Sequence, residues 1–470
     1  MTDPLFWHRL QFGFTIAYHY LFPQLTMGLG LLIVLLRAHA LRTGSEETAA
    51  AARFWTRVFG INFAVGVVTG IPMEFQFGTN WSRFSLYAGG VIGQALAMEG
   101  MFAFFLESSF LGLVLYGEQR LSKKLHFAAT VALWLGSWLS GYFIVATNAF
   151  MQHPVGHLVV SGGSAGGPGK LQIGDLAAFL FNPWALVAYA HTMSGAVVTG
   201  AFVMAGVGAF WTLSGTHREQ GLLALRLGVC AGLAASVLQL FPTADWQAKL
   251  VAKHQPATLA AMEGVFKGGP RQGMALIGQP DVAAGRIDNP IEVPRLLSML
   301  AYGSFEAPVK GLDDFPADQK PDNIELLYYS YHVMAGLGTL FIALMGLSVL
   351  LLWRGRLWET RPVLWALLLA TPFPYIANTA GWMTAELGRQ PWLVYGLFRT
   401  AQGSSPQVGA GDTLFSLLGF AGLYLLIGVA FLGMVGREIL HGPGGAHGAT
   451  AHAPPLVAGA PGSAVAAESR

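Results

Sequence analysis

Nine long apolar segments constrain the fold of this chain more than any other feature of its sequence. They lie near residues 12–36, 58–78, 91–116, 127–149, 184–213, 222–242, 326–353, 362–385 and 413–437. Each is long enough to cross the roughly 30 Å hydrocarbon core of a bilayer. Charged residues make up only 11% of the chain, against about 25% in a typical soluble domain. We therefore expect an all-α, multi-pass integral membrane protein with nine transmembrane helices.

The distribution of positive charge predicts how the helices are oriented. The connections after the odd-numbered segments carry Arg37, Arg42, Arg53, Arg57, Arg120, Lys123, Lys124, Arg218, Arg226, Arg354, Arg356, Arg361 and Arg437, whereas the short connections on the other side carry only Arg83, Lys170, Arg389 and Arg399. By the positive-inside rule the N-terminus lies outside and the C-terminus in the cytoplasm. Residues 1–4 lack the basic start of a signal peptide, so we expect the first segment to be retained. A net charge of +2 gives no indication of nucleic acid binding.

The same pattern divides the chain into four parts. Residues 1–242 hold six helices, residues 243–325 form a long polar connection, residues 326–437 hold three helices, and residues 438–470 form a low-complexity tail that we predict to be disordered. Long connections usually have a function. Within this one, residues 255–264 predict a short helix that ends at a glycine. The alternative is that the connection only covers the helix ends.

Five side chains of metal-binding type fall in the outer half of the predicted bundle: His19, Glu99, His191, Met334 and Glu386. An ionisable group at bilayer depth costs roughly 3 kcal/mol on insertion scales, so it normally pairs, binds a cofactor or carries protons. Histidine, methionine and carboxylate without cysteine suit haem iron better than copper or iron–sulfur centres. His191 and Met334 are the types that form a six-coordinate, low-spin haem, and His19 and Glu386 could each hold one iron of a reactive pair.

Each of these residues also has an ordinary structural interpretation. His191 could be a hydrogen-bonded core histidine, and Met334 could simply fill space in the core. Glu386 could form an ion pair with Arg389 at i+3, within an aromatic belt that includes Trp382. Alternatively, Arg389 could hold the propionate of a bound macrocycle.

Two further carboxylates indicate a route for protons. Glu99 and Glu107 are eight residues apart, which on a regular helix places them within about 80° of each other. Such a ladder suits proton transfer from the cytoplasm to a buried reaction centre, although polar neighbours could also satisfy both groups. Pro23, Pro372 and Pro374 predict bends in the first and eighth helices.

Two other classes of membrane protein could also contain some of these features. An ion-coupled transporter would explain buried carboxylates and bent helices, but the sequence has no obvious inverted repeat, and the candidate ligands lie away from the midplane. A cytochrome b that only transfers electrons would be expected to carry histidine pairs spaced along two helices, and this pattern is absent from the sequence.

Several segments resemble subunit I of the cytochrome bd-type quinol oxidases, in order and over nearly the whole chain. They are residues 9–12, 18–22, 60–64, 73–81, 99–107, 182–183, 191–192 and 388–392. The connection is short for this family and resembles the short-loop branch, which includes cyanide-insensitive enzymes. The resemblance implies a bacterial cytoplasmic (inner) membrane enzyme that oxidises ubiquinol or menaquinol outside and reduces dioxygen to water with cytoplasmic protons, generating a proton motive force without pumping.

The resemblance also implies cofactors and partners. A low-spin haem b would be ligated by His191 and Met334. A high-spin pair, haem b with haem d or with a further haem b, would use His19 and Glu99 for one iron and Glu386 for the other. A homologous subunit II, and in some members a single-helix accessory subunit, would lie beside this chain in the lipid bilayer.

Roles for four more residues follow from the resemblance. Glu263 matches an acidic residue involved in quinol oxidation, and Glu107 matches a proton-channel residue. Trp382 and Arg389 match residues that flank the high-spin haems.

Two positions depart from the family pattern. Thr258 stands where a lysine usually precedes the loop glutamate, and the nearest alternative is Lys253. His332 replaces an arginine two residues before the methionine ligand. Because histidine is cationic only when protonated, we expect a lower or more pH-dependent potential for the low-spin haem. His332 could also compete with Met334 as a ligand.

Overall fold

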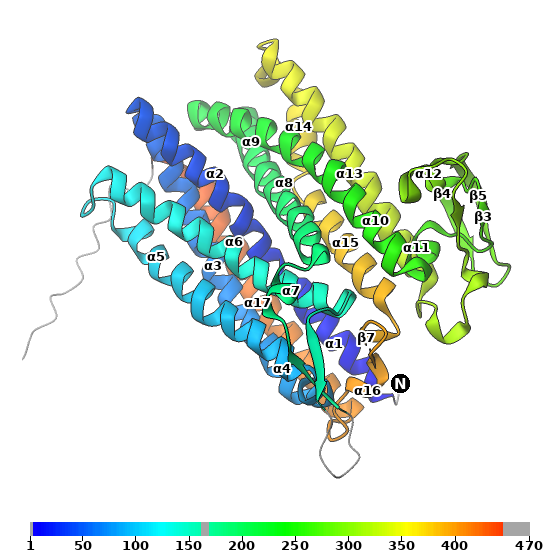
Figure 1. Cartoon of the computed structure of the whole chain (residues 1–470). Helices are drawn as coiled ribbons and strands as arrows, with labels where there is room; N and C mark the ends of the chain where they lie inside the picture. Colours follow the sequence, from blue (N-terminus) through cyan, green and yellow to red (C-terminus); the bar gives the residue numbers. More distant parts are fainter. Residues whose placement is uncertain (1–2, 161–168, 445–470) are drawn as a thin grey trace, which may run out of the picture.

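The computed structural model describes residues 3–160 and 169–444, and it consists mainly of long helices that run side by side (Figure 1). In chain order they are α1 (Pro4–His19), α2 (Leu21–Thr43), α3 (Glu46–Thr79), α4 (Ser82–Met98), α5 (Phe105–Tyr116), α6 (Lys123–Gln152), α7 (Leu176–Leu180), α8 (Pro183–Ser214), α9 (Arg218–Leu238), α10 (Asp245–His254), α11 (Pro256–Glu263), α12 (Leu296–Tyr302), α13 (Ile324–Trp353), α14 (Arg361–Leu369), α15 (Phe373–Arg389), α16 (Thr400–Gly403) and α17 (Ala410–His441).

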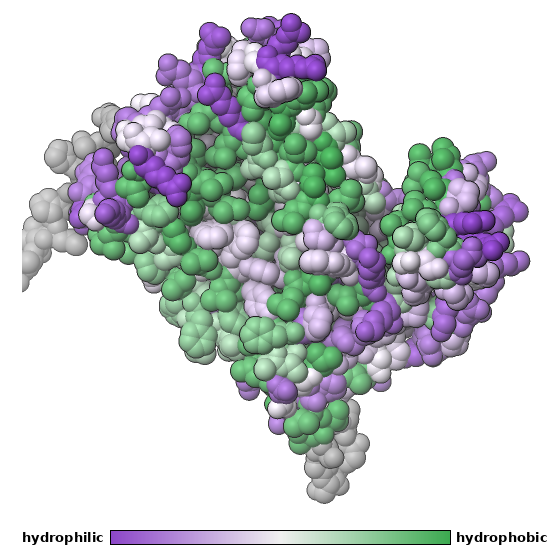
Figure 2. Space-filling view, turned by 45° about the horizontal axis from the view of Figure 1, so that its top comes forward, coloured by the Kyte–Doolittle hydropathy of each residue, from purple (hydrophilic) through white to green (hydrophobic). Residues whose placement is uncertain are grey.

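The predicted all-α membrane fold is confirmed. In the described part of the chain eight helical stretches are long and apolar enough to span a membrane, and α14 with α15 forms a ninth span that bends by 40°. The bend falls between Leu369 and Phe373, beside Pro372, as predicted. Figure 2 shows apolar residues over the middle of the molecule and hydrophilic residues at the helix ends and over the long connection.

The first span breaks at Tyr20, three residues before the proline expected to bend it. Pro23 has no N–H to bond the carbonyl of residue i−4, which is His19, and its ring crowds that carbonyl. The break therefore lies directly after His19, one of the candidate ligands.

One span contains a π-helical turn that the sequence pattern does not reveal, and another is kinked. The π-helical turn η1 (Glu99–Phe104) joins α4 to α5, whereas η2 (Gln239–Ala244) joins α9 to α10 across a kink at Phe241, whose φ of −140° and ψ of 124° are extended. The prediction of a regular helix across residues 91–116 is therefore wrong, and so is the 80° offset between Glu99 and Glu107 derived from it. Turns of this kind occur frequently at functional sites.

Helices extend beyond two of the predicted boundaries. After the kink at Phe241, α10 runs to His254, inside the connection predicted to begin at residue 243. At the C-terminus α17 continues to His441, past the predicted end at residue 437, and the rest of the predicted tail from residue 445 lies outside the described residues.

The long connection folds into short elements beside the bundle (Figure 1). Its first helix, α11, ends at Gly264 with φ of 69°, as the sequence predicts. Four strands follow: β3 (Gly269–Pro270), β4 (Met274–Asp281), β5 (Arg286–Val293) and β6 (Pro308–Val309). They form two antiparallel pairs, β4 with β5 and β3 with β6. Elsewhere β1 (His157–Val160) pairs with β2 (Lys170–Ile173), and β7 (Trp392–Val394) with β8 (Phe398–Arg399).

The core of the bundle is built around α8, whose most apolar stretch is 78% buried. Glycines allow α2 to approach it closely. A Cβ added to Gly200 of α8 would fall 2.8 Å from the carbonyl carbon of Gly28 in α2, which is too close for any side chain. Small residues at such contacts are a common way of packing helices in lipid.

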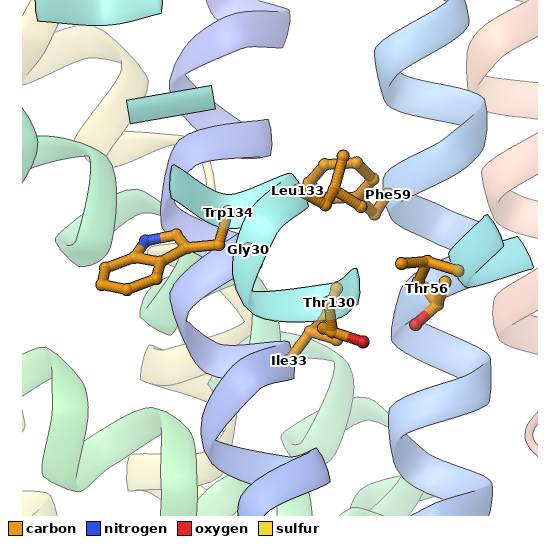
Figure 3. Close-up of a pocket in the computed structure, with 8 residues that line it drawn as sticks. Gly30, Ile33, Thr56, Phe59, Thr130, Leu133 and Trp134 are labelled. Atoms are coloured by element: carbon orange, nitrogen blue, oxygen red, sulfur yellow. The ribbon is translucent and has the colours of Figure 1, made fainter. Parts of the chain in front are cut away.

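A small apolar cavity beside this contact provides a test of the packing (Figure 3). It is lined by Gly30, Ile33, Thr56, Phe59, Val114, Thr130, Leu133 and Trp134. A Cβ on Gly30 would lie 3.4 Å from Cδ1 of Trp134 and 3.6 Å from Cε2 of Phe59, in ordinary contact. Glycine inside a helix costs roughly 0.5–1 kcal/mol relative to alanine. We therefore expect Gly30→Ala to raise the midpoint of thermal unfolding of the purified protein.

The neighbouring glycine supplies the matched control. A Cβ on Gly28 would collide with the carbonyl oxygen of Ala196, so Gly28→Ala should lower the same midpoint. A Gly30→Ala protein that unfolds at or below the wild-type temperature would contradict the expectation.

Candidate functional site

His19 is held by a hydrogen bond that determines which of its nitrogens is free. Its Nδ1 lies 3.2 Å from Oγ1 of Thr69 in α3. The Thr69 hydroxyl donates its proton to the backbone carbonyls of Val65 and Gly66, at 2.9 and 3.0 Å. Its oxygen must then accept from His19, so Nδ1 carries the proton and Nε2 keeps a lone pair. Gly70 makes room for the ring, because a Cβ there would lie 2.9 Å from its Cε1.

His191 on α8 has the same arrangement. Its Nδ1 lies 3.2 Å from Oγ1 of Thr243, and that hydroxyl donates to the carbonyls of Leu238 and Gln239, at 3.1 and 2.9 Å. Thr243 belongs to the kinked segment η2. A hydrogen-bond acceptor on the far nitrogen of the ring is the usual companion of a metal-binding histidine. Both histidines are therefore prepared to bind a metal through Nε2.

Met334 lies on α13 against α15. Its sulfur would be 2.8 Å from a Cβ on Gly381, so the absence of a side chain at Gly381 makes room for the thioether. Trp382 is the next residue and is half-buried.

His332 lies two residues before Met334, and both of its ring nitrogens have partners. Nδ1 lies 2.8 Å from the carbonyl oxygen of Tyr328, and Nε2 lies 2.9 Å from that of Ala275 in β4. Both nitrogens face carbonyl oxygens, so this geometry does not favour His332 over Met334 as a metal ligand. The Nε2 contact instead joins α13 to the long connection.

Glu99 and Glu107 both face α6. Oε1 of Glu99 accepts a hydrogen bond of 2.6 Å from Ser140. Glu107, only 6% exposed, is hydrogen-bonded to Ser137. Ser137 and Ser140 are three residues apart and lie on the same face of α6. The π-helical turn between the glutamates turns both toward this face, so the predicted ladder forms by a different helical geometry.

Glu386 faces the same helix nearer the long connection. Its Oε1 accepts a bond of 2.7 Å from Asn148, and Gln152 approaches it at 3.5 Å. Ser137 and Asn148 are eleven residues apart on α6, a rise of about 16 Å. The carboxylates thus follow one another along α6 in the order Glu107, Glu99, Glu386.

Arg389 is the ion-pair partner of Glu386, as one of the two interpretations of the sequence describes. The guanidinium is 2% exposed and also donates to the carbonyls of Trp392 and Leu393. Its buried Nε has no hydrogen-bond partner in the described part of the chain. A carboxylate has about four lone-pair positions, so the contacts with Arg389 and Asn148 leave Glu386 able to bind a metal.

Glu263 forms a second centre, at the end of α11. It is 4% exposed, and one hydrogen bond joins it to Tyr331 of α13. Burial raises the pKa of the Glu263 carboxyl to about 7, against the smaller lowering effect of the Tyr331 bond. Among the described residues no Lys or Arg forms an ion pair with it.

The structure accounts for Thr258 at the position of the usual lysine. Its hydroxyl donates a bond of 2.6 Å to the carbonyl of Gly388, so it joins α11 to the end of α15. Lys253 is exposed at the end of α10 and does not take the place of the missing lysine.

The donor set fits haem. Across residues 3–160 and 169–444 no three His, Cys, Asp or Glu side chains gather as a group that could hold a metal ion. A haem needs only one or two protein ligands, because the macrocycle supplies the others. Two single histidines with Nε2 free and a methionine sulfur facing a glycine match that requirement.

Sequence reasoning missed the groups that position these side chains. They are Thr69, Thr243, Ser137, Ser140 and Asn148. The two serines and the asparagine could have been noticed in the sequence, since they recur at helical spacing within one apolar segment. The two threonines could not, because their partners come from other helices.

Comparisons with known proteins agree with the resemblance seen in the sequence. The family model described as cytochrome bd terminal oxidase subunit I matches residues 7–443. A cytochrome bd ubiquinol oxidase subunit 1 from Bacillus subtilis (strain 168) is 36% identical, over 92% of this chain and 93% of the relative. A cytochrome bd-II ubiquinol oxidase subunit 1 from Escherichia coli (strain K12) is 31% identical, over 94% and 98%. The solved bd oxidase from Geobacillus thermodenitrificans superposes with a TM-score of 0.85 at 30% identity, covering 94% of this chain and 99% of that one.

Proposed function

The chain belongs to the cytochrome bd terminal oxidase subunit I family, and from that premise we propose the roles of its residues. The family makes it a quinol oxidase subunit that carries haem and works with a subunit II. We assign His191 and Met334 to the low-spin haem b, His19 and Glu99 to one iron of a high-spin pair, and Glu386 to the other, the pair being haem b with haem d or with a further haem b. When bound, the haems supply electron transfer and oxygen reduction.

The observation that carries this assignment is the hydrogen-bonding arrangement shared by the two histidines. In each, Nδ1 faces a threonine hydroxyl that donates to backbone carbonyls, which leaves Nε2 as the atom available to a metal. Arg389 and Trp382, beside Glu386, would flank the high-spin pair.

Glu107, Glu99 and the serines of α6 would carry protons toward that pair. Ser140 is 2.6 Å from Glu99, and Ser137 bonds to Glu107 one turn away on the same helix face. In the proposed orientation, with the N-terminus outside, Glu107 is nearer the cytoplasm. Protons for water would then come from the cytoplasm and quinol protons would leave outside, so charge is separated across the bacterial inner membrane without pumping.

Glu263 would accept a proton from quinol beneath the long connection. Because burial raises its pKa to about 7, the proton-accepting carboxylate predominates only above that pH. We expect kcat/KM for quinol to rise as pH increases from about 6 to 8, since a group must be deprotonated to act as a base. Steady-state oxygen consumption over this pH range measures the effect.

The matched control for this pH dependence is Glu263→Gln, which keeps the shape and removes the titration. The variant should be slower and lose the rise around pH 7. An unchanged pH profile in the variant would remove Glu263 from the proton path.

The experiment that tests the function as a whole is a dithionite-reduced minus air-oxidised optical spectrum of the purified complex, with pyridine haemochrome analysis. Haem bands with a chlorin signal in the red support the oxidase with haem d, and bands of haem b alone support the variant without it. A folded complex without haem would instead favour the second candidate, an ion-coupled transporter in which the buried carboxylates bind the ion.

A further inference from the structure

The pocket around Glu263 contains two buried polar atoms that lack hydrogen-bond partners in the described part of the chain. They are Oε2 of Glu263 and the hydroxyl oxygen of Tyr328, on residues that are 4% and 1% exposed. A buried polar group left unpaired costs about 1–3 kcal/mol. Two such atoms in one place indicate that something outside the chain pairs with them.

Two glycines show how closely Tyr328 packs against the end of α11 and against β4. Gly264 directly follows Glu263, and a Cβ there would lie 3.0 Å from Cε2 of Tyr328. A Cβ on Gly278 of β4 would lie 3.3 Å from the Tyr328 hydroxyl. Tyr328 of α13 therefore lies between β4 and the end of α11, where Glu263 is located, and it is near enough to Glu263 to interact with it electrostatically.

The Tyr328 ring is held by ring stacking in which its hydroxyl group takes no part. It stacks on the ring of His332 with centroids 3.9 Å apart and an angle of 29°. Tyr331, which bonds to Glu263, meets the same His332 ring edge-on at 5.3 Å. Phenylalanine would stack equally well at position 328 and would bury no unpaired oxygen, so packing alone does not explain a tyrosine.

The two atoms have complementary hydrogen-bonding capacities. The carboxylate oxygen of Glu263 only accepts, whereas the Tyr328 hydroxyl donates as well. A phenolic hydroxyl of a quinol can donate to the first and accept from the second with the same oxygen. After oxidation the quinone carbonyl can still accept from Tyr328.

We propose that Tyr328 belongs to the quinol site. Its hydroxyl would donate a hydrogen bond to the head-group oxygen whose proton Glu263 accepts. This inference rests on the proposed function, in which Glu263 takes part in quinol oxidation. Side-chain atoms of Ile287 on β5 lie close to both glycines, so the β4–β5 hairpin packs over Tyr328 and the end of α11. Binding of the head group at these atoms would require Ile287 to move aside.

The test is Tyr328→Phe, which removes the hydroxyl and keeps the ring. Loss of one hydrogen bond corresponds to a rise in KM of up to about 10-fold for short-chain ubiquinol and menaquinol analogues. Oxygen consumption driven by tetramethyl-p-phenylenediamine, an electron donor without hydroxyl groups, should stay at the wild-type rate. The haem spectrum should be unchanged, and the thermal midpoint should be equal or higher, because an unpaired group has been removed.

The matched control is Tyr329→Phe, the next residue on α13, whose side chain is 45% exposed. It should leave the KM for quinol unchanged. A Tyr328→Phe protein with wild-type KM and a raised thermal midpoint would overturn the proposal, because the hydroxyl would then be only an unsatisfied group. A wild-type complex with haem that oxidises the diamine but neither quinol would instead overturn the proposed function.

Discussion

Replacing His191 with alanine is expected to remove one haem per protein and nearly all quinol-driven oxygen consumption. In the proposed assignment His191 supplies Nε2 as a ligand to the low-spin haem iron, and alanine offers no replacement. Loss of a ligand's hydrogen-bond partner typically costs 10–100-fold in metal affinity, so loss of the ligand itself should cost more than roughly 100-fold. Pyridine haemochrome analysis counts the haem, and the reduced-minus-oxidised spectrum should lose the low-spin bands.

Thr243→Val provides the graded comparison for His191→Ala. Valine keeps the volume of threonine but removes the oxygen 3.2 Å from His191 Nδ1. The low-spin haem should remain at saturating haem and dissociate more readily, by about 10–100-fold. His39→Ala, at an exposed position on α2, controls for the loss of any histidine. Full low-spin haem content in His191→Ala would contradict the assignment.

Replacing Glu107 with leucine is expected to slow oxygen reduction by a factor on the order of 100, the lower end of what a positioned proton donor or acceptor contributes. Glu107 is buried within its span, where leucine is well tolerated but cannot exchange a proton. The haems should stay bound because this carboxyl is assigned to no iron. Stopped-flow oxidation of the reduced enzyme by oxygen measures the step directly.

Two controls separate proton transfer from damage to the fold. Glu107→Asp keeps a carboxyl group and should recover part of the rate. Glu438→Gln removes a carboxylate from α17 that pairs with Arg57, outside the proposed route, and should leave oxygen reduction unchanged. Wild-type turnover in Glu107→Leu would take this residue off the proton path.

The membrane fold can be predicted from the sequence alone. Nine apolar segments predict nine spans because lipid allows only helices or closed barrels, and this constraint acts on each segment separately. The bend at Pro372 and the helix that ends at Gly264 were predictable for the same reason, since proline and glycine act on the backbone locally. The family motifs, such as residues 73–81 and 388–392, are likewise continuous in the sequence.

The groups that position the candidate ligands become visible only in the folded chain. Thr69 and Thr243 contact Nδ1 of His19 and His191 across sequence separations of 50 and 52 residues. The π-helical turn at Glu99–Phe104 likewise depends on how its span packs, which hydropathy does not record.

The pocket at Glu263 shows the same division most clearly. Glu263 is recognisable in the sequence through the family resemblance, but Tyr328 and His332 belong to another segment and meet it only when α13 packs against the long connection. Hydropathy and helix signals depend on neighbours along the chain, whereas a hydrogen bond depends on neighbours in space. For this reason the sequence alone predicts the spans and names candidate ligands, and only the folded chain shows which atoms of those side chains are free to bind.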